Sequence, residues 1–319
     1  MITLRSDDLL VRVDPDHGGE LLDLIDLRSG RQLLGRPPFG SEPALPGELD
    51  EERWTRSYRG GWQSVLPNAG NPCDSATGHH GFHGRASNDP WRLLDHDEDY
   101  ARMSWAGHGL EVEKLIALED GAVAVRYRIS SAHGAPLVAV EHLSVGLELL
   151  EPEVRIDLPA GHAYELSEQD GPLSPPADAT RFPTLRLLDG STERADRWPI
   201  GEPRSRLYVV SDLPAGWAVI ANAARNHGLA MAWDVEWYRH CWVWHENRVS
   251  GGVWRGAAEM LVVEPATVPH SLGLSVAEAS GHARRIEPGI VAEPWIVVRP
   301  VRGVEAVSSV GRDGRLLLR

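Results

Sequence analysis

The stretch PLVAVEHLSV, residues 136–145, carries the pattern that decides the fold of this chain. Its side chains alternate between two faces with a period of two residues, which is typical of a β-strand. In that register His142 shares one face with Val138 and Val140. Comparable alternation recurs along the chain, in residues 122–130, 154–159, 216–224, 227–235, 241–246 and 257–265.

Turn signals fall between these segments, and helical periodicity is scarce. Pairs that end in glycine and favour tight turns occur at residues 29–30, 120–121, 133–134 and 189–190. The best helix candidate is 275–280, which Gly281 would end, and a short helical turn is expected near 48–53. Many antiparallel strands with almost no helix predict a sandwich or barrel. For this length we expect a large antiparallel β-sandwich of the all-β class.

The Pro-rich stretch GPLSPPADATR, residues 171–181, is the best candidate for a linker between domains. Strand patterns continue on both sides of it without a change in composition. We therefore interpret it as a long loop, and we expect residues 1–319 to form a single domain.

Composition and charge limit the classes of partner. The 319 residues are 42% hydrophobic and 24% charged, with a formal net charge of -14. This charge argues against nucleic acid and anionic membranes, which bind clustered positive charge. Two cysteines imply no disulfide framework, and neither a signal peptide nor a membrane-spanning segment is apparent. We expect a cytoplasmic protein, and the sequence leaves a homodimer open.

The stretch GHHGFHGRASNDPW, residues 78–91, places three histidines within five residues. Such a cluster indicates either a site or an exposed loop. The histidines and cysteines that could bind a metal fall in two groups: Cys73, His79, His80 and His83, and His240, Cys241 and His245. Neither group has the paired spacing of zinc sites. We therefore expect no metal ion, and we interpret His79 and His80 as loop residues.

Three further residues are candidates for chemistry or binding. Asn68 lies in the irregular segment RGGWQSVLPNAGNP, residues 59–72, and could bind a polyol or shape a structural turn. His142 either is a hydrogen-bonded core residue or points into a cavity. Glu264 ends an apolar strand face behind Met260 and Val262, so its carboxylate is either a base with a raised pKa or a strand-end group in solvent.

Tryptophan is unusually frequent, with 12 Trp against 6 Tyr and 3 Phe. Indoles near polar loops offer flat apolar faces on which sugars stack. The indoles near polar loops are Trp62, Trp91, Trp242, Trp244 and Trp254. Most of the twelve are expected simply to fill a sandwich core.

Taken in order, these elements resemble the aldose 1-epimerase, or galactose mutarotase-like, family. The resemblance covers residues 2–300 and rests on LLVRVDPDHGGELLDLIDLRSGRQLL, GGWQSVLPNAG, HGRASNDPW, EHLSVGLELLEPEVRIDLPAG, WVWHENRVSGG and the Glu-Pro of MLVVEPAT. The family fold is one large antiparallel β-sandwich. The likeness places His83, rather than His79 or His80, on the family's His-Gly motif.

The resemblance implies an enzyme that interconverts the α and β anomers of a free aldose without a cofactor. Glu264 would be the base, His142 the acid on the ring oxygen, and His83 its assistant. The monosaccharide contacts that we expect are Trp62, Asn68, Trp91, Trp244 and, more weakly, Asp234.

Two positions depart from the family pattern. Ser87 stands where the family often has an arginine, and Asn71 stands where its sugar loop often ends in Gly-Arg. Losing two basic contacts disfavours a sugar phosphate. Two alternatives stay open: a carbohydrate-binding or regulatory protein without catalysis, and another sugar isomerase or lyase that uses the same residues.

Overall fold

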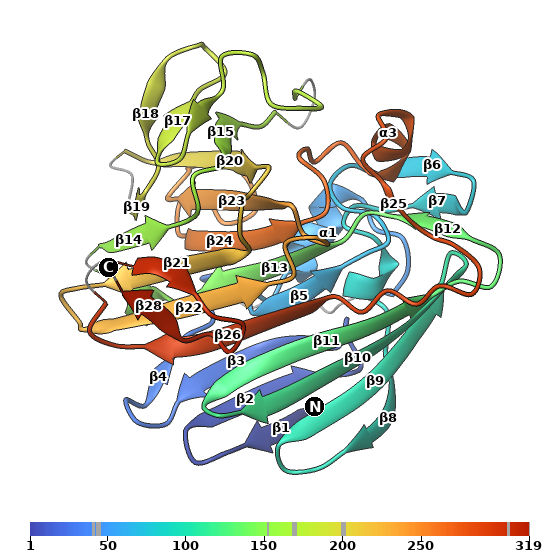
Figure 1. Cartoon of the computed structure of the whole chain (residues 1–319), viewed down its shortest axis with the longest axis horizontal. Helices are drawn as coiled ribbons and strands as arrows, with labels where there is room; N and C mark the ends of the chain where they lie inside the picture. The colour runs from blue at the N-terminus through green and yellow to red at the C-terminus, as the bar shows by residue number, and fades with distance from the viewer. Residues whose placement is uncertain are drawn as a thin grey trace.

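The computed structural model describes residues 1–39, 42, 46–151, 153–167, 171–198, 202–304 and 307–318. Within these ranges the chain forms two large sheets, three small two-stranded sheets, three α-helices and one 3-10 turn (Figure 1). Strand pairing is antiparallel except between β15 and β17. The prediction of an all-β sandwich is therefore confirmed.

The first large sheet has 13 strands in the described ranges. In order across the sheet they are β1 (Ile2–Arg5), β2 (Leu9–Asp14), β3 (Glu20–Asp26), β5 (Trp62–Val65), β13 (Val140–Val145), β24 (Glu259–Ala266), β23 (His240–Asn247), β20 (Arg204–Ser211), β15 (His162–Glu165), β17 (Thr184–Arg186) and β18 (Thr192–Arg194), with β4 (Arg31–Gln32) beside β3 and β16 (Thr180–Arg181) beside β15.

The second large sheet has nine strands in the same ranges. In order they are β19 (Arg197–Trp198), β14 (Val154–Asp157), β21 (Trp217–Asn222), β22 (His227–Trp233), β26 (Trp295–Val301), β11 (Ala122–Ser130), β10 (Leu110–Glu119), β9 (Tyr100–Gly107) and β8 (Arg92–His96). The small sheets pair β12 (Ala135–Leu137) with β25 (Arg284–Ile286), β27 (Val307–Val310) with β28 (Leu316–Leu318), and β6 (Cys73–Ser75) with β7 (Gly78–His80).

The helical elements are short: α1 (Glu51–Ser57), α2 (Leu147–Leu150), α3 (Leu274–Ala279) and the 3-10 turn η1 (Arg85–Ser87). The helix expected at 275–280 is α3, and the turn expected near 48–53 extends into α1. Among the helices of the described residues, none is long and apolar enough to cross a membrane.

The stretch 136–145 is not one strand, contrary to the prediction. The chain forms β12, which pairs with β25, and begins β13 after two intervening residues. The apolar alternation is similar in both strands, so the sequence does not reveal the change of sheet. Both sides of the loop 171–181 contribute to the 13-stranded sheet, with β15 before the loop and β17 after it.

Alternate residues of the central strands serve two different layers. Leu143, Val263 and Val243 point into the main core between the two large sheets. The residues between them point outward, where Val140 and Trp242 belong to a second apolar cluster. A strand exposes successive side chains on opposite faces, so the same three strands build the core on one face and a covered outer surface on the other.

Candidate functional site

A cleft of about 740 Å³ lies on the outer face of the 13-stranded sheet. This volume is within the range of small-molecule sites. Residues of β13, β20, β23 and β24 line it, together with α1 and the loop that follows β23. Its lining includes Glu264, His142, His83, Trp244, Trp254 and Arg206.

His142 and Glu264 form the floor of this cleft. In the β13–β24 ladder Leu143 is opposite Val263 and Val140 is opposite Ala266, so His142 is directly opposite Glu264. Opposed residues of an antiparallel pair have neighbouring side chains on one face. The His142 Nε2 atom lies 3.9 Å from the Glu264 Oε1 atom, and each side chain is 3% exposed.

Burial displaces the pKa values of this pair in opposite directions. It raises the pKa of Glu264 to about 8, and it lowers the pKa of His142 to about 3. Burial disfavours the charged form of each group. Between these two pKa values the pair holds one titratable proton, which the Glu264 carboxyl group carries while His142 is neutral.

His83 reaches the cleft from a loop with a constrained backbone. Its φ is 58°, in the left-handed region, and Gly84 follows with φ 64°. The Gly70 N–H donates to the His83 Nδ1 atom at 3.1 Å. Neutral His83 therefore carries its proton on Nε2 and can donate from there. The rings of His83 and His142 are 5.8 Å apart, and burial keeps the pKa of His83 well below its usual value.

Helix α1 supplies the aromatic groups behind the two histidines. Trp54 lies with its ring 4.5 Å from that of His83, and the Tyr58 hydroxyl is 3.4 Å from the His142 Nδ1 atom. Burial raises the pKa of Tyr58 above its usual value, so the hydroxyl keeps its proton. When the Nδ1–H of neutral His142 donates to that hydroxyl, the Nε2 atom, which faces Glu264, is left as an acceptor for a proton.

The sequence analysis missed the role of α1. The one local signal was a helix start: Asp50 caps the helix by accepting from the Arg53 N–H at 2.8 Å, and acidic Glu51 and Glu52 follow it. Ser87, one of the two departures from the family pattern, also serves this helix. Its Oγ atom accepts from the Trp54 Nε1–H at 3.3 Å.

Two indoles form a wall of the cleft. The rings of Trp244 and Trp254 are 5.6 Å apart at 39°, and Trp244 lies 6.3 Å from the His142 ring. The Trp244 Nε1–H donates to the Ser205 Oγ atom at 3.1 Å, which fixes the orientation of the indole. This wall provides a flat apolar surface at one side of the cleft.

The basic residue that lines the cleft among those described is Arg206, which the sequence analysis did not single out. Its Nε atom donates to Glu165 Oε1 at 3.2 Å, and its Nη1 atom pairs with Glu193. Two carboxylates thus neutralise this guanidinium. A free arginine fork for a sugar phosphate is not present among the described cleft residues.

Four residues expected to contact the monosaccharide do not line the cleft. Asn68 is fully buried and holds loops together: it accepts from the Leu274 N–H at 2.6 Å and donates to the Gly81 carbonyl at 2.8 Å. Trp62 points into the main core and donates to Glu141 at 2.7 Å. Both side chains are therefore structural, and we withdraw them as sugar contacts.

Trp91 and Asp234 are also remote from the cleft. The Trp91 Nε1–H donates to the Ala86 carbonyl at 2.8 Å, and its ring packs in the main core. Asp234 follows β22 of the other large sheet and accepts from the Glu236 N–H at 3.1 Å in a tight turn. Of the predicted contacts, Trp244 lines the cleft, as does Asn71, the second departure from the family pattern.

No family model matches the chain, and no curated protein matches it. Solved structures do. The Slr1438 protein of Synechocystis sp. PCC 6803 is similar with a TM-score of 0.65 and 17% identity, over 94% of this chain and 95% of that one. An Escherichia coli K12 protein provisionally named an aldose 1-epimerase has a TM-score of 0.63 and 15% identity, over 94% and 98%.

A galactose mutarotase-like protein from Lactobacillus casei ATCC 334 is similar with a TM-score of 0.62 and 12% identity, over 94% of this chain and 99% of that one. Identities this low establish a common fold and nothing finer. The chain therefore has the galactose mutarotase-like β-sandwich fold.

Proposed function

We propose that this protein is an aldose 1-epimerase of the galactose mutarotase-like family, which interconverts the α and β anomers of a free monosaccharide. The observation that carries the proposal is the opposed pair of Glu264 and His142 on the floor of a cleft with an indole wall. Anomer exchange needs one base and one acid at neighbouring atoms of the sugar. It requires no cofactor.

In the proposed reaction the Glu264 carboxyl proton moves first to the His142 Nε2 atom, once the two groups close from their separation of 3.9 Å. The Glu264 carboxylate then removes the proton of the C1 hydroxyl, and the His142 imidazolium gives its proton to the ring oxygen. The bond between C1 and the ring oxygen breaks, which leaves an open-chain aldehyde. Rotation about C1–C2 and the reverse transfers close the ring as the other anomer, and the pair regains its starting state.

His83 assists as a neutral hydrogen-bond donor. Its Nδ1 atom is occupied by the Gly70 N–H, so its Nε2–H is free to stabilise the developing charge on the ring oxygen. The neutralised Arg206 favours an uncharged sugar over a sugar phosphate.

The test is the rate at which freshly dissolved α-D-glucose and α-D-galactose approach anomeric equilibrium, followed by polarimetry. We expect the wild type to accelerate at least one sugar. Glu264→Gln should lower kcat by about 10²- to 10⁴-fold, because a positioned acid–base group contributes that much. Wild-type turnover by Glu264→Gln would refute the assignment.

A carbohydrate-binding protein without catalysis is the second candidate, because the wall of Trp244 and Trp254 serves binding and catalysis equally. It predicts that the wild type binds a monosaccharide in a calorimetric titration and leaves the anomerisation rate of that same sugar unchanged. Acceleration of the bound sugar would exclude it.

A further inference from the structure

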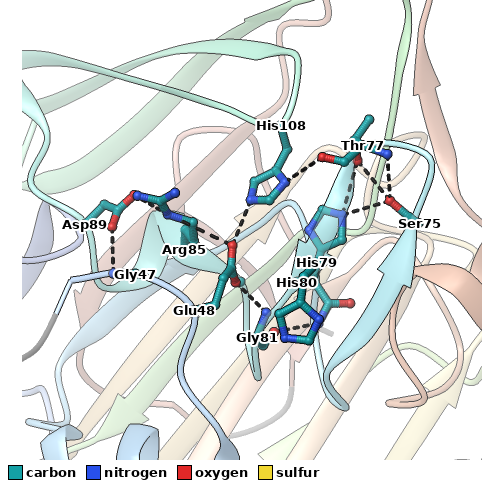
Figure 2. Close-up of polar contacts among 12 residues, drawn as sticks. Gly47, Glu48, Ser75, Thr77, His79, His80, Gly81, Arg85, Asp89 and His108 are labelled. Carbon is teal, nitrogen blue, oxygen red and sulfur yellow. Dashed lines mark hydrogen bonds and ion pairs between the residues drawn. The ribbon is translucent and has the colours of Figure 1, made fainter.

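A segment outside the cleft connects the His83 loop to the start of α1. The Glu48 carboxylate accepts a hydrogen bond from the Gly81 N–H and another from the His108 Nε2–H, the latter at 2.8 Å (Figure 2). A methyl group on Gly81 would lie 2.5 Å from the Leu49 N atom, so this glycine allows the close approach of the two segments. Neither Glu48 nor His108 lines the cleft.

His108 faces an acceptor at each ring nitrogen. Its Nδ1 atom lies 3.1 Å from the Thr77 carbonyl oxygen, and its Nε2 atom lies 2.8 Å from the Glu48 carboxylate. A carbonyl and a carboxylate accept hydrogen bonds and donate none. A neutral imidazole has one N–H, so both contacts are hydrogen bonds only when His108 is an imidazolium.

Among the surrounding charges, Glu48 favours this cation and Arg85 opposes it. Arg85 lies 4.0 Å from Glu48 but pairs more closely with Asp89, at 2.9 Å (Figure 2). His80, whose ring is 4.2 Å from that of His108, is buried rather than a simple loop residue.

The His80 Nε2 atom bonds the hydroxyls of Ser75 and Thr77, and burial together with the nearby His108 lowers the pKa of His80 to about 4. In the ladder of the same hairpin, exposed His79 lies opposite Asp74 and pairs with it at 2.8 Å. Neutral His80 therefore adds no second positive charge beside His108.

The contacts of Glu48 lie beside the two elements that carry the cleft aromatics. Leu49, the next residue, accepts from the Phe82 N–H at 2.7 Å, directly before His83. Asp50 then caps α1, which brings Trp54 against His83. The Glu48–Gly81 and Leu49–Phe82 bonds thus fix the distance between the start of α1 and the His83 loop.

We propose that Glu48 and His108 form a positioning clamp that holds the His83 loop against the start of α1 while His108 is protonated, and that loss of this proton loosens the loop. The expected effect of the clamp on turnover rests on the proposed function. The structural coupling of His108 to His83 is independent of that function.

The direction of the pH effect follows from the contacts. The hydrogen bond to Glu48 raises the pKa of His108. Burial would raise the pKa of Glu48, but the hydrogen bonds from His108 and Gly81 outweigh it and lower that pKa. The stabilisation from His108 is therefore fully present below its usual pKa of about 6.5 and is lost as the pH rises through its raised value.

Two substitutions of Glu48 separate the effect of its negative charge from the effect of its hydrogen bond to the Gly81 N–H. A glutamine at residue 48 can still accept from the Gly81 N–H, and its amide can donate to the Nε2 atom of a neutral His108. We therefore expect Glu48→Gln to keep the His83 loop in place wherever His108 is neutral, including the alkaline pH at which the wild-type loop loosens. Glu48→Ala should loosen the loop at every pH and lower kcat roughly 10-fold, since small displacements near a reacting group have effects of at least that size.

The direct readout is NMR of ¹⁵N-histidine-labelled protein across pH 5–10. We expect His108 to remain an imidazolium above the usual histidine pKa of about 6.5, and the His83 ring signals to shift as His108 loses its proton. In Glu48→Gln that shift of the His83 signals should vanish. His79→Gln is the matched control, because it removes another hairpin His–carboxylate pair and should leave both His83 and kcat unchanged.

The outcomes distinguish the two proposals. If His108 loses its proton at or below the usual histidine pKa of about 6.5, or if the His83 signals do not change when it does, the clamp is overturned whether or not the protein is an enzyme. If the coupling is present but no sugar is epimerised, the clamp stands and the proposed function fails. If wild type and Glu48→Ala turn over equally, the clamp has no effect on catalysis and that part of the inference is lost.

Discussion

Glu141 and Glu264 are buried carboxylates on neighbouring strands that face opposite sides of one sheet. Glu141 points into the main core, where it accepts from Trp62 at 2.7 Å and from Tyr238 at 3.1 Å. Burial raises the pKa of Glu141, and the charge of buried Lys114 opposes that rise. Glu264 faces the cleft, and burial raises its pKa to about 8.

The comparison shows what separates a structural carboxylate from a reactive one. Both are buried, so burial alone does not mark a site. Glu141 has donors from the core that hold it in place, whereas Glu264 has His142 at 3.9 Å and open volume above it. A group whose hydrogen-bonding capacity is left for a ligand is available for chemistry.

The largest expected difference between Glu141 and Glu264 is in how their substitution changes the free energy of unfolding. Glu141→Gln should lower the unfolding free energy by about 2 kcal/mol or more, because it removes the larger of the two carboxylate charges that act on buried Lys114 and weakens two buried hydrogen bonds. Glu264→Gln should raise it at pH 7 by up to about 3 kcal/mol, because glutamine carries no ionisable group that favours the unfolded state there.

The gain in unfolding free energy for Glu264→Gln follows from the pKa of Glu264, which burial raises to about 8. The folded protein retains a proton that the unfolded chain releases near pH 4.5, so this residue makes stability fall as the pH rises from there toward 8. Urea unfolding of both variants at pH 5 and pH 7 measures the two effects. Equal destabilisation by both substitutions would contradict the contrast.

The next effect concerns the pH profile of catalysis. If the Glu264–His142 pair must hold one proton, kcat/KM should be level near neutrality and fall about tenfold per pH unit above pH 8, where that proton is lost. The measurement is the anomerisation rate from pH 5 to pH 10, corrected for the uncatalysed reaction. A rate that keeps rising above pH 9 would show that the carboxylate works without its partner's proton.

The smallest effect compares two tryptophans. Trp244→Ala should raise KM roughly 5- to 10-fold with little change in kcat, because it removes one stacking surface of the cleft. Trp62→Phe removes the core hydrogen bond to Glu141, so it should lower the unfolding temperature and leave KM near wild type. Steady-state kinetics and thermal unfolding of both variants test this. A higher KM for Trp62→Phe than for Trp244→Ala would reverse the assignment.

Much of the fold could be predicted from local alternation. The segment 122–130 matches β11 (Ala122–Ser130) residue for residue, because the two faces of that strand differ in polarity. The segment 136–145 could not be divided correctly, because β12 and β13 share one pattern and differ only in their pairing partners. The two-residue alternation of a strand does not show which distant strand it pairs with.

The site was predictable only in part, for a related reason. The likeness to a family pointed to Glu264, His142 and His83, which come together in the cleft. The predicted tryptophan and asparagine contacts depended on the direction in which each side chain points, which the local sequence does not show. Trp62, for example, lies in an irregular segment near the cleft but points into the core. Arg206 carried no local signal, since its neighbours come from distant strands.

The most direct test of the central claim is a double-mutant cycle of Glu264→Gln and His142→Gln, with α–β exchange of a sugar at equilibrium measured by NMR exchange spectroscopy. If the two residues share one proton and act as a unit, each single variant should lose nearly all catalysed exchange, and the double variant should be little worse than either. Independent, multiplying losses, or exchange that persists in Glu264→Gln, would contradict the account.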